Sequence, residues 1–208
     1  MKRCFIYSAG TFYGLRVQPQ PGDYQIAADA GLLLCQKIGL EPDLVIGDFD
    51  SMPQPQDGPT VRVPVEKDDT DTMLAIREGL AYGCTEFHLY GATGGRRLDH
   101  TLANLQSLAF LRRHGARGFL YDDNFVYTVL ENEALTVPQT VPWALLSIFN
   151  LESRAEGLTL RGVQYGLTDA VLDSAFPVGV SNHILAPEAQ ISVRRGLLLA
   201  GWELPPLP

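Results

Sequence analysis

The sequence predicts an α/β protein in which an N-terminal three-layer, Rossmann-like domain with a parallel sheet precedes a C-terminal all-β sandwich domain. Two observations lead to this fold class. Up to about residue 122, short apolar runs alternate with helical segments, which is typical of a parallel sheet covered by helices. Beyond residue 123 no long helical pattern remains, and short strand-like runs follow one another. We therefore place the two domains at residues 1–123 and 124–208.

We expect six strands and three helices in the first domain. Each predicted helix is followed by a glycine, and glycine readily adopts the left-handed conformation that ends many helices. Because strands and helices alternate, we expect the strands to be parallel. The strands are predicted at 4–8, 24–28, 43–47, 61–65, 86–90 and 117–121, and the helices at 30–38, 71–82 and 100–114.

The second domain shows the pattern of half-exposed antiparallel strands. Ile191 and Val193 alternate with Ser192 and Arg194, so one face of that strand is apolar and the other polar. Several short strands of this kind indicate a β-sandwich. The runs are 125–130, 134–137, 143–149, 158–161, 180–185, 190–194 and 197–202.

Composition restricts the functional class. A net charge of −8 argues against a nucleic-acid-binding surface, which needs clustered Lys and Arg. No apolar run approaches the roughly 20 residues of a membrane span, and the first residues do not form a signal peptide. Three cysteines without C-x-x-C spacing indicate neither a disulfide framework nor a zinc site. We expect a cytoplasmic protein with reduced cysteines.

Carboxylates follow the ends of several predicted strands. Asp48 and Asp50 come directly after an apolar run, Asp29 follows the second strand, and the fourth strand leads to Lys67 and Asp71. In open α/β sheets ligands bind at the carboxyl ends of the strands. Several acids on one rim would repel one another without a cation, and carboxylate oxygens suit Mg²⁺. Each residue alone could instead serve a turn or, like Thr70 or Asp29, a helix cap.

A glycine-rich segment follows the fifth predicted strand. Gly91, Gly94 and Gly95 allow close backbone approach, and the helix that follows directs its positive end toward the segment. Arg96 or Arg97 could then stabilise phosphoryl oxygens. A plain glycine-rich connection is the alternative. The sequence has no G-x-x-x-x-G-K-[ST] motif, so any nucleotide must be held differently.

Taken together, these segments resemble the thiamine pyrophosphokinase (thiamine diphosphokinase) family. The motifs follow the family's order and lie in both predicted domains. They are Ala28-Asp29-Ala30-Gly31, Pro42-Asp43-Leu44-Val45-Ile46-Gly47-Asp48-Phe49-Asp50-Ser51, Lys67-Asp68-Asp69-Thr70-Asp71, Gly91-Ala92-Thr93-Gly94-Gly95-Arg96-Arg97-Leu98-Asp99-His100 and Val180-Ser181-Asn182-His183.

The resemblance implies transfer of pyrophosphate from ATP to the hydroxyethyl group of thiamine, giving thiamine diphosphate and AMP. It also implies a homodimer whose active sites lie between subunits. The family roles, carried over, make Asp48, Asp50 and Asp71 the catalytic, Mg²⁺-binding carboxylates, with Arg97 and Asp99 acting beside them. The nucleotide would be bound by Asp29, Lys67, Thr70, Gly94, Gly95 and Arg96, and thiamine by Ser181 and Asn182.

The sequence departs from the family pattern at three positions and leaves alternatives open. Ala30 stands where the family usually has glycine, the phosphate contact could come from Arg96 or Arg97, and His183 replaces a residue that is often Glu or Thr. A pyrophosphokinase or nucleotidyl hydrolase acting on another small substrate is the first alternative function. A nucleotide- or thiamine-binding module without turnover is the second.

Overall fold

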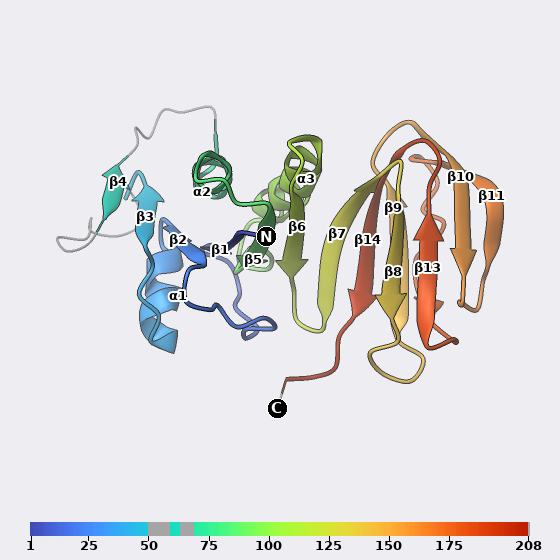
Figure 1. The fold of residues 1–208 in the computed structure, drawn as a ribbon, viewed down its shortest axis with the longest axis horizontal. Helices are drawn as coiled ribbons and strands as arrows, with labels where there is room; N and C mark the ends of the chain where they lie inside the picture. The colour runs from blue at the N-terminus through green and yellow to red at the C-terminus, as the bar shows by residue number, and fades with distance from the viewer. Residues whose placement is uncertain (50–58, 63–68, 208) are drawn as a thin grey trace. The chain divides into compact units, whose positions relative to one another are not determined.

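The chain folds into two units, Met1–Asp123 and Asn124–Pro208, which are described one at a time (Figure 1). The structure is a computed structural model, and it describes residues 1–49, 59–62 and 69–207. It contains a large mixed sheet and a separate antiparallel sheet, which confirms the α/β class of the prediction.

The first unit is built on a parallel sheet with the strand order β6-β5-β1-β2-β3-β4. Every pairing between these neighbours is parallel, which confirms the predicted strand direction. The fourth strand is short, and part of its predicted range, 63–65, lies outside the described residues. The strands are β1 (Arg3–Tyr7), β2 (Tyr24–Ala28), β3 (Leu44–Gly47), β4 (Thr60–Arg62), β5 (Glu86–Tyr90) and β6 (Arg117–Tyr121).

Three helices connect these strands: α1 (Gly31–Ile38), α2 (Asp71–Ala81) and α3 (Leu98–Arg113). Each ends close to its predicted stop. Gly39 caps α1 in the left-handed conformation, with φ of 70°. Gly83 and Gly115, which follow the caps of α2 and α3, also have positive φ. The sequence thus marks the helix ends because only glycine takes this conformation without strain from a Cβ.

Helices lie on both faces of the sheet. A Cβ at Gly79 of α2 would come within 2.6 Å of the Phe87 ring and 2.9 Å of the Cys4 sulfur, so the missing side chain lets α2 approach closely. On β6, a Cβ at Gly118 would meet Leu108 and Leu111 of α3 at 2.7 Å. Figure 1 shows α1 on the side of the sheet opposite α2 and α3. Covering both faces explains why the strands are almost continuously apolar.

The second unit contains antiparallel strands and, among its described residues, no helix. Its strands have the orders β12-β9-β14-β7 and β11-β10-β13-β8. They are β7 (Phe125–Glu131), β8 (Ala134–Pro138), β9 (Leu145–Asn150), β10 (Arg154–Arg161), β11 (Leu167–Asp173), β12 (Asn182–His183), β13 (Glu188–Ser192) and β14 (Leu197–Glu203).

β11 was not predicted from the sequence. Its sequence, LTDAVLD, contains two aspartates and an alanine, which strands generally disfavour. Its position explains how it forms a strand: β11 lies at the edge of its sheet and pairs only with β10. Leu172 is buried while Val171 is 49% exposed, so only one face of this strand makes apolar contacts. The strand is held by these contacts and by its backbone pairing with β10.

Within the described residues, no helix combines the length and apolar character that a membrane span requires.

Candidate active site

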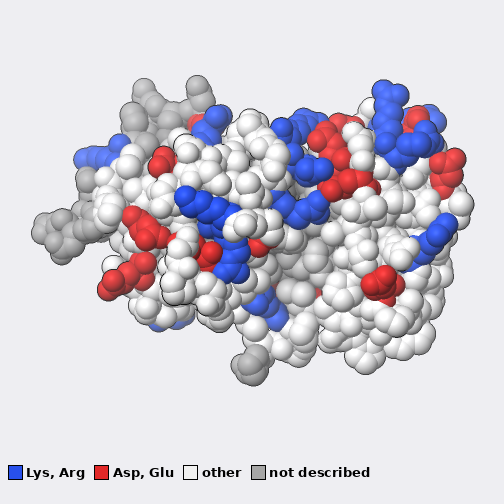
Figure 2. Space-filling view, in the orientation of Figure 1, with Lys and Arg blue, Asp and Glu red and all other residues white. Residues whose placement is uncertain are grey.

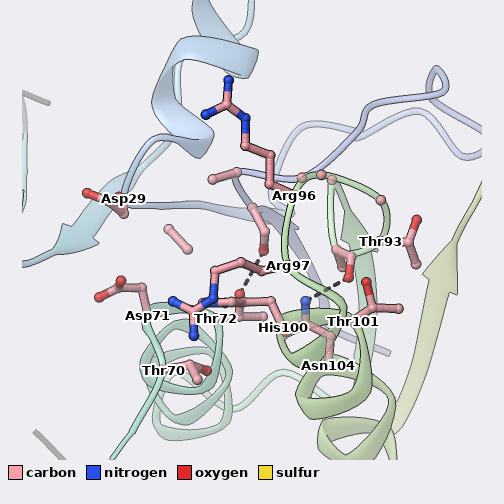
Figure 3. A pocket seen from close by; sticks show the side chains of 18 residues that line it. Asp29, Thr70, Asp71, Thr72, Thr93, Arg96, Arg97, His100, Thr101 and Asn104 are labelled. Atoms are coloured by element: carbon pink, nitrogen blue, oxygen red, sulfur yellow. Dashed lines mark hydrogen bonds between the residues drawn. The ribbon is translucent and has the colours of Figure 1, made fainter. Parts of the chain in front are cut away.

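A cavity of about 480 Å³ lies at the carboxyl ends of the parallel strands (Figure 3). Segments that are distant in sequence form its wall: Ser8–Gly10 after β1, Asp29 after β2, and Gly91–Arg97 after β5. The first turns of α2 and α3 complete it. The strand-end segments therefore meet at one rim, as the parallel sheet predicts.

The segment Gly91–Arg97, here called the glycine loop, rests directly on the backbone that follows β1. The amide of Ser8 donates to the Tyr90 carbonyl at 2.9 Å, and the amide of Gly10 donates to the Gly91 carbonyl at 2.7 Å. A Cβ on Gly91, whose φ is 62°, would lie 2.3 Å from the Ser8 carbonyl oxygen. A Cβ on Gly10 would lie 2.3 Å from the carbonyl oxygen of Thr93. Glycine is required here because the two backbones touch.

The glycine loop presents several groups that attract anions. Within the described chain, the amides of Gly94 and Arg96 make no hydrogen bond. The N-terminus of α3 begins just beyond the loop, and its dipole also favours negative charge. Figure 3 shows Arg97 extending toward Asp71, while Arg96 extends the opposite way. Both arginines line the cavity. Such a loop can bind phosphate groups.

Arg97 and Asp99 form an ion pair at the start of α3. The Arg97 Nε donates to Asp99 Oδ1 at 3.1 Å, and the two side chains are 68% and 61% exposed. The hydrogen bond from Arg97 lowers the pKa of Asp99 and, in turn, raises that of Arg97. Asp99 does not line the cavity, so in this arrangement it restrains Arg97 from outside.

The predicted acidic residues occupy different places around the rim. Asp29 and Asp71 line the cavity, whereas Asp48 is nearly buried beyond β3 and is not part of the wall. Asp50 and Lys67 lie outside the described residues. Within residues 1–49, 59–62 and 69–207 no three His, Cys, Asp or Glu side chains are grouped closely enough to hold a metal ion.

Thr70 and Asp29 were each predicted either to line a ligand site or to cap the helix that follows. Thr70 caps α2, since its Oγ1 accepts a hydrogen bond from the Met73 amide at 3.2 Å, and Thr70 also lines the cavity. Asp29 does not cap α1, because Ala30 occupies the cap position. Instead, Asp29 has a left-handed backbone with φ of 46°, and its amide donates to the Ile46 carbonyl at 2.8 Å. A Cβ on Gly47 would come within 3.0 Å of the Asp29 Cα, so the close approach of the two backbones at the ends of β2 and β3 favours glycine.

Buried polar groups beneath the glycine loop were missed by the sequence analysis. The hydroxyls of Ser8 and Thr72 are 2.9 Å apart, and Asn104 Nδ2 donates to the Ala92 carbonyl at 2.7 Å. All four residues line the cavity. The strand-end rule would have found Ser8 had it been applied to the first strand as well. Thr72 and Asn104 lie inside helices, and no local signal distinguishes them.

The predicted thiamine-site residues lie in the second unit. Asn182 is 5% exposed, and its Oδ1 accepts from the amides of Tyr165 at 3.0 Å and His183 at 2.9 Å. Its Nδ2 donates to the Tyr165 carbonyl at 2.9 Å. Ser181 has a left-handed φ of 59°, and its amide donates to the Ser147 hydroxyl at 3.1 Å. Asn182 therefore organises the backbone around it.

Asn182 also lines a second cavity, of about 210 Å³, enclosed by apolar side chains. Its wall comes from both sheets of the second unit, with Ile148 on β9 and Leu158 and Leu160 on β10. Trp202 is 8% exposed and pairs in register with Leu146 and Val126. The structure thus assigns Trp202 to the core.

The face drawn in Figure 2 shows basic and acidic side chains interspersed, so this face has no extended patch of one sign among the described residues. The electrostatic character of the first cavity is therefore local, and it comes from Asp29, Asp71, Arg96 and Arg97.

Two family models match the chain in succession. Residues 20–120 match the model described as "Thiamin pyrophosphokinase, catalytic domain", and residues 134–198 match "Thiamin pyrophosphokinase, vitamin B1 binding domain". Among curated proteins, thiamine pyrophosphokinase of Bacillus subtilis (strain 168) is 25% identical over 181 residues, which is 84% of each chain.

Solved structures show the same fold. The thiamine pyrophosphokinase from Bacillus subtilis superposes with a TM-score of 0.88 at 22% identity, covering 98% of this chain and 99% of that one. A thiamin pyrophosphokinase family protein from Enterococcus faecalis gives a TM-score of 0.84 at 27% identity, covering 99% and 100%.

Proposed function

The chain belongs to the thiamine pyrophosphokinase family, and from this premise we propose how its residues perform that reaction. The enzyme transfers pyrophosphate from ATP to the hydroxyethyl group of thiamine, giving thiamine diphosphate and AMP. The observation that carries this function is the match of both family models, in order, to the two successive parts of the chain.

The reaction depends on aligning thiamine with ATP, and it needs no covalent intermediate with the protein. The thiamine hydroxyl oxygen bonds to the β-phosphorus of ATP, the bond from that phosphorus to the α,β-bridging oxygen breaks, and the hydroxyl proton is released. Phosphoryl transfer of this kind depends on positioning and on neutralising charge. In our proposal the glycine loop and the N-terminus of α3 hold the phosphates. The unbonded amides of Gly94 and Arg96 and the two cavity-lining arginines support this assignment.

We assign the nearest charged groups as follows. Arg97 contacts the transferring phosphates, and Asp99 keeps its guanidinium in place through the ion pair. Arg96, Gly94 and Gly95 bind the remaining phosphate oxygens. Asp29 and Thr70, which line the cavity, contact the nucleotide. Lys67, the other residue proposed for this role, lies outside the described residues.

The acidic rim is suited to Mg²⁺. Asp48 and Asp71 supply carboxylate oxygens, the ligand type that Mg²⁺ prefers, and Asp50 would be the third donor. Because the described residues contain no group of three such donors, the proposal depends on Asp50. When bound with ATP, the ion would neutralise phosphate charge. The protein's part is to supply these carboxylates to the ion, and of the described pair Asp71 lines the cavity.

Thiamine is proposed to bind to the second unit. The matched vitamin B1 binding model covers residues 134–198, which include Ser181 and Asn182. We further propose a homodimer in which the α/β unit of one subunit meets the thiamine-binding unit of the other. If so, mixing impaired Asp71→Asn subunits with subunits impaired in thiamine binding by Asn182→Ala should restore part of the activity in heterodimers. We propose a cytoplasmic location, in keeping with the three free, buried cysteines.

Product analysis with ATP, thiamine and Mg²⁺ tests the function. Equal amounts of AMP and thiamine diphosphate are expected. ADP or free phosphate with no thiamine diphosphate would indicate a kinase or hydrolase that acts on another substrate. Binding of both ligands with no product would indicate a module without turnover.

A further inference from the structure

We propose that Thr11, in the connection between β1 and β2, is a positioning residue that fixes the tip of the glycine loop for ATP binding. The inference rests on the proposed function, because it takes the glycine loop as the phosphate-binding segment. Thr11 itself is not part of the cavity wall. Its role is therefore to act through the loop and not on the nucleotide.

Thr11 holds the loop on both sides of Gly94. Its amide donates to the Thr93 carbonyl at 2.8 Å, and its Oγ1 accepts a hydrogen bond from the Gly95 amide at 3.2 Å. The two bonds involve the two peptide groups that flank Gly94. Thr11 also packs against this residue, since a Cβ at Gly94 would lie 2.4 Å from Thr11 Oγ1.

Such a restraint matters most where the loop is intrinsically most mobile. Gly94 and Gly95 have positive φ values of 67° and 78°, and consecutive glycines lose more conformational freedom on ordering than other residues. A peptide group that is already oriented does not have to be ordered when the ligand binds. Thr11 thus lowers the entropy cost of placing the unbonded Gly94 amide against a phosphate.

The rest of the loop does not depend on Thr11. Asn104 holds the Ala92 carbonyl, Asp122 accepts a hydrogen bond from the Thr93 hydroxyl at 2.7 Å, and Gly10 binds Gly91. Thr11 is exposed, so losing its hydroxyl leaves no buried polar group unpaired. We therefore expect replacement of the hydroxyl to affect ATP binding and to leave the fold intact.

The test compares Thr11→Val, which removes the acceptor at nearly constant shape, with Thr11→Ser, which keeps it. Thr85→Val is the matched control, because Thr85 is an exposed threonine beside β5 at the end remote from the cavity. The readouts are steady-state constants, the melting temperature, and calorimetric binding of α,β-methylene-ATP, which cannot be cleaved at the reacting bridge.

For Thr11→Val we expect about fivefold weaker analogue binding and a similar rise in the ATP KM, as losing one hydrogen bond implies. The thiamine KM and the melting temperature should not change, and Thr11→Ser and Thr85→Val should resemble the wild type. Wild-type ATP affinity in Thr11→Val would overturn the inference, as would equal losses of affinity in the Val and Ser variants. A wild-type protein that makes no thiamine diphosphate would instead refute the proposed function.

Discussion

The cavity at the strand ends of the first unit is lined mainly by glycines, hydroxyls and charged side chains, whereas the cavity beside Asn182 in the second unit is enclosed mainly by leucine, isoleucine and valine. The first measures about 480 Å³ and contains Arg96, Arg97, Asp29 and Asp71. The second measures about 210 Å³, and its wall includes one buried amide side chain, that of Asn182.

The contrast follows from the two kinds of sheet. A parallel sheet covered on both faces leaves its strand ends as the place where loops and helix N-termini can present charge and amides. Two antiparallel sheets bury apolar side chains between them, so a cavity between the two sheets is lined mainly by apolar side chains. The first cavity therefore offers backbone amides and charge, and the second offers an apolar wall with one amide side chain.

The largest expected effect concerns the acidic rim. Asp71→Asn should lower kcat about a hundredfold or more, because it removes one carboxylate charge from the proposed Mg²⁺ site. The melting temperature should stay near the wild-type value. Glu78→Gln, two turns further along α2, is the control and should retain activity. Full activity of Asp71→Asn at saturating Mg²⁺ would remove Asp71 from the metal site.

The next effect separates the two arginines. Arg97→Ala should reduce kcat/KM about a hundredfold, the loss typical of one preorganised donor to the transition state. Arg96→Ala should cost clearly less, since its side chain extends the opposite way in Figure 3. Measuring kcat/KM for both variants under the same conditions shows which arginine contributes more. A larger loss in Arg96→Ala would exchange their assigned roles.

A smaller, two-part effect is expected in the second unit. Asn182→Ala should raise the thiamine KM far more than the ATP KM, and it should lower the free energy of unfolding by about 1–3 kcal/mol because three hydrogen bonds disappear. Asn150→Ala is a matched control, since Asn150 also makes three hydrogen bonds to backbone groups. If Asn150→Ala raised the thiamine KM equally, Asn182 would have only a structural role.

The smallest effect is a pH dependence of stability in the first unit. Burial lowers the pKa of His88 below its ordinary value, although the hydrogen bond to Glu86 at 3.0 Å opposes this. As the pH falls below about 6.5, the unfolded chain takes up a proton that the folded chain does not, so the free energy of unfolding decreases.

Urea unfolding of the wild type and His88→Gln at pH 8, 7, 6 and 5 measures this contribution. The wild type should lose its stability advantage over the variant as the pH decreases, by at most about 1.4 kcal/mol per pH unit. Curves that stay parallel across the range would show that His88 titrates alike in both states.

The sequence predicted the first unit closely because local signals and sheet topology agree there. Glycine stops located the ends of all three helices, and apolar runs located the strands. The positions of strand ends predicted that Asp29, Thr70, Asp71 and the glycine loop share one rim, and all of them line one cavity. Asp48 was predicted on the same rim, but it does not line this cavity.

The contacts that depend on tertiary approach were not predictable. Thr11 reaches Gly95 across 84 positions of sequence, and Ser8 reaches Thr72 across 64. Neither residue belongs to a motif, so periodicity cannot identify it. For the same reason β11 was missed: its edge position and its pairing with β10 outweigh an unfavourable composition.

The order of strands in the first unit also has a consequence during synthesis. β1 lies between β2 and β5, so during synthesis β1 gains its second neighbour only when residues 86–90 emerge. At 5–20 residues per second that interval is roughly 4–16 s. Throughout it, one edge of a strand containing Cys4, Phe5 and Ile6 has no partner. Nascent chains stalled before residue 86 should therefore bind chaperones that recognise apolar strands, and chains extended past residue 121 should be released.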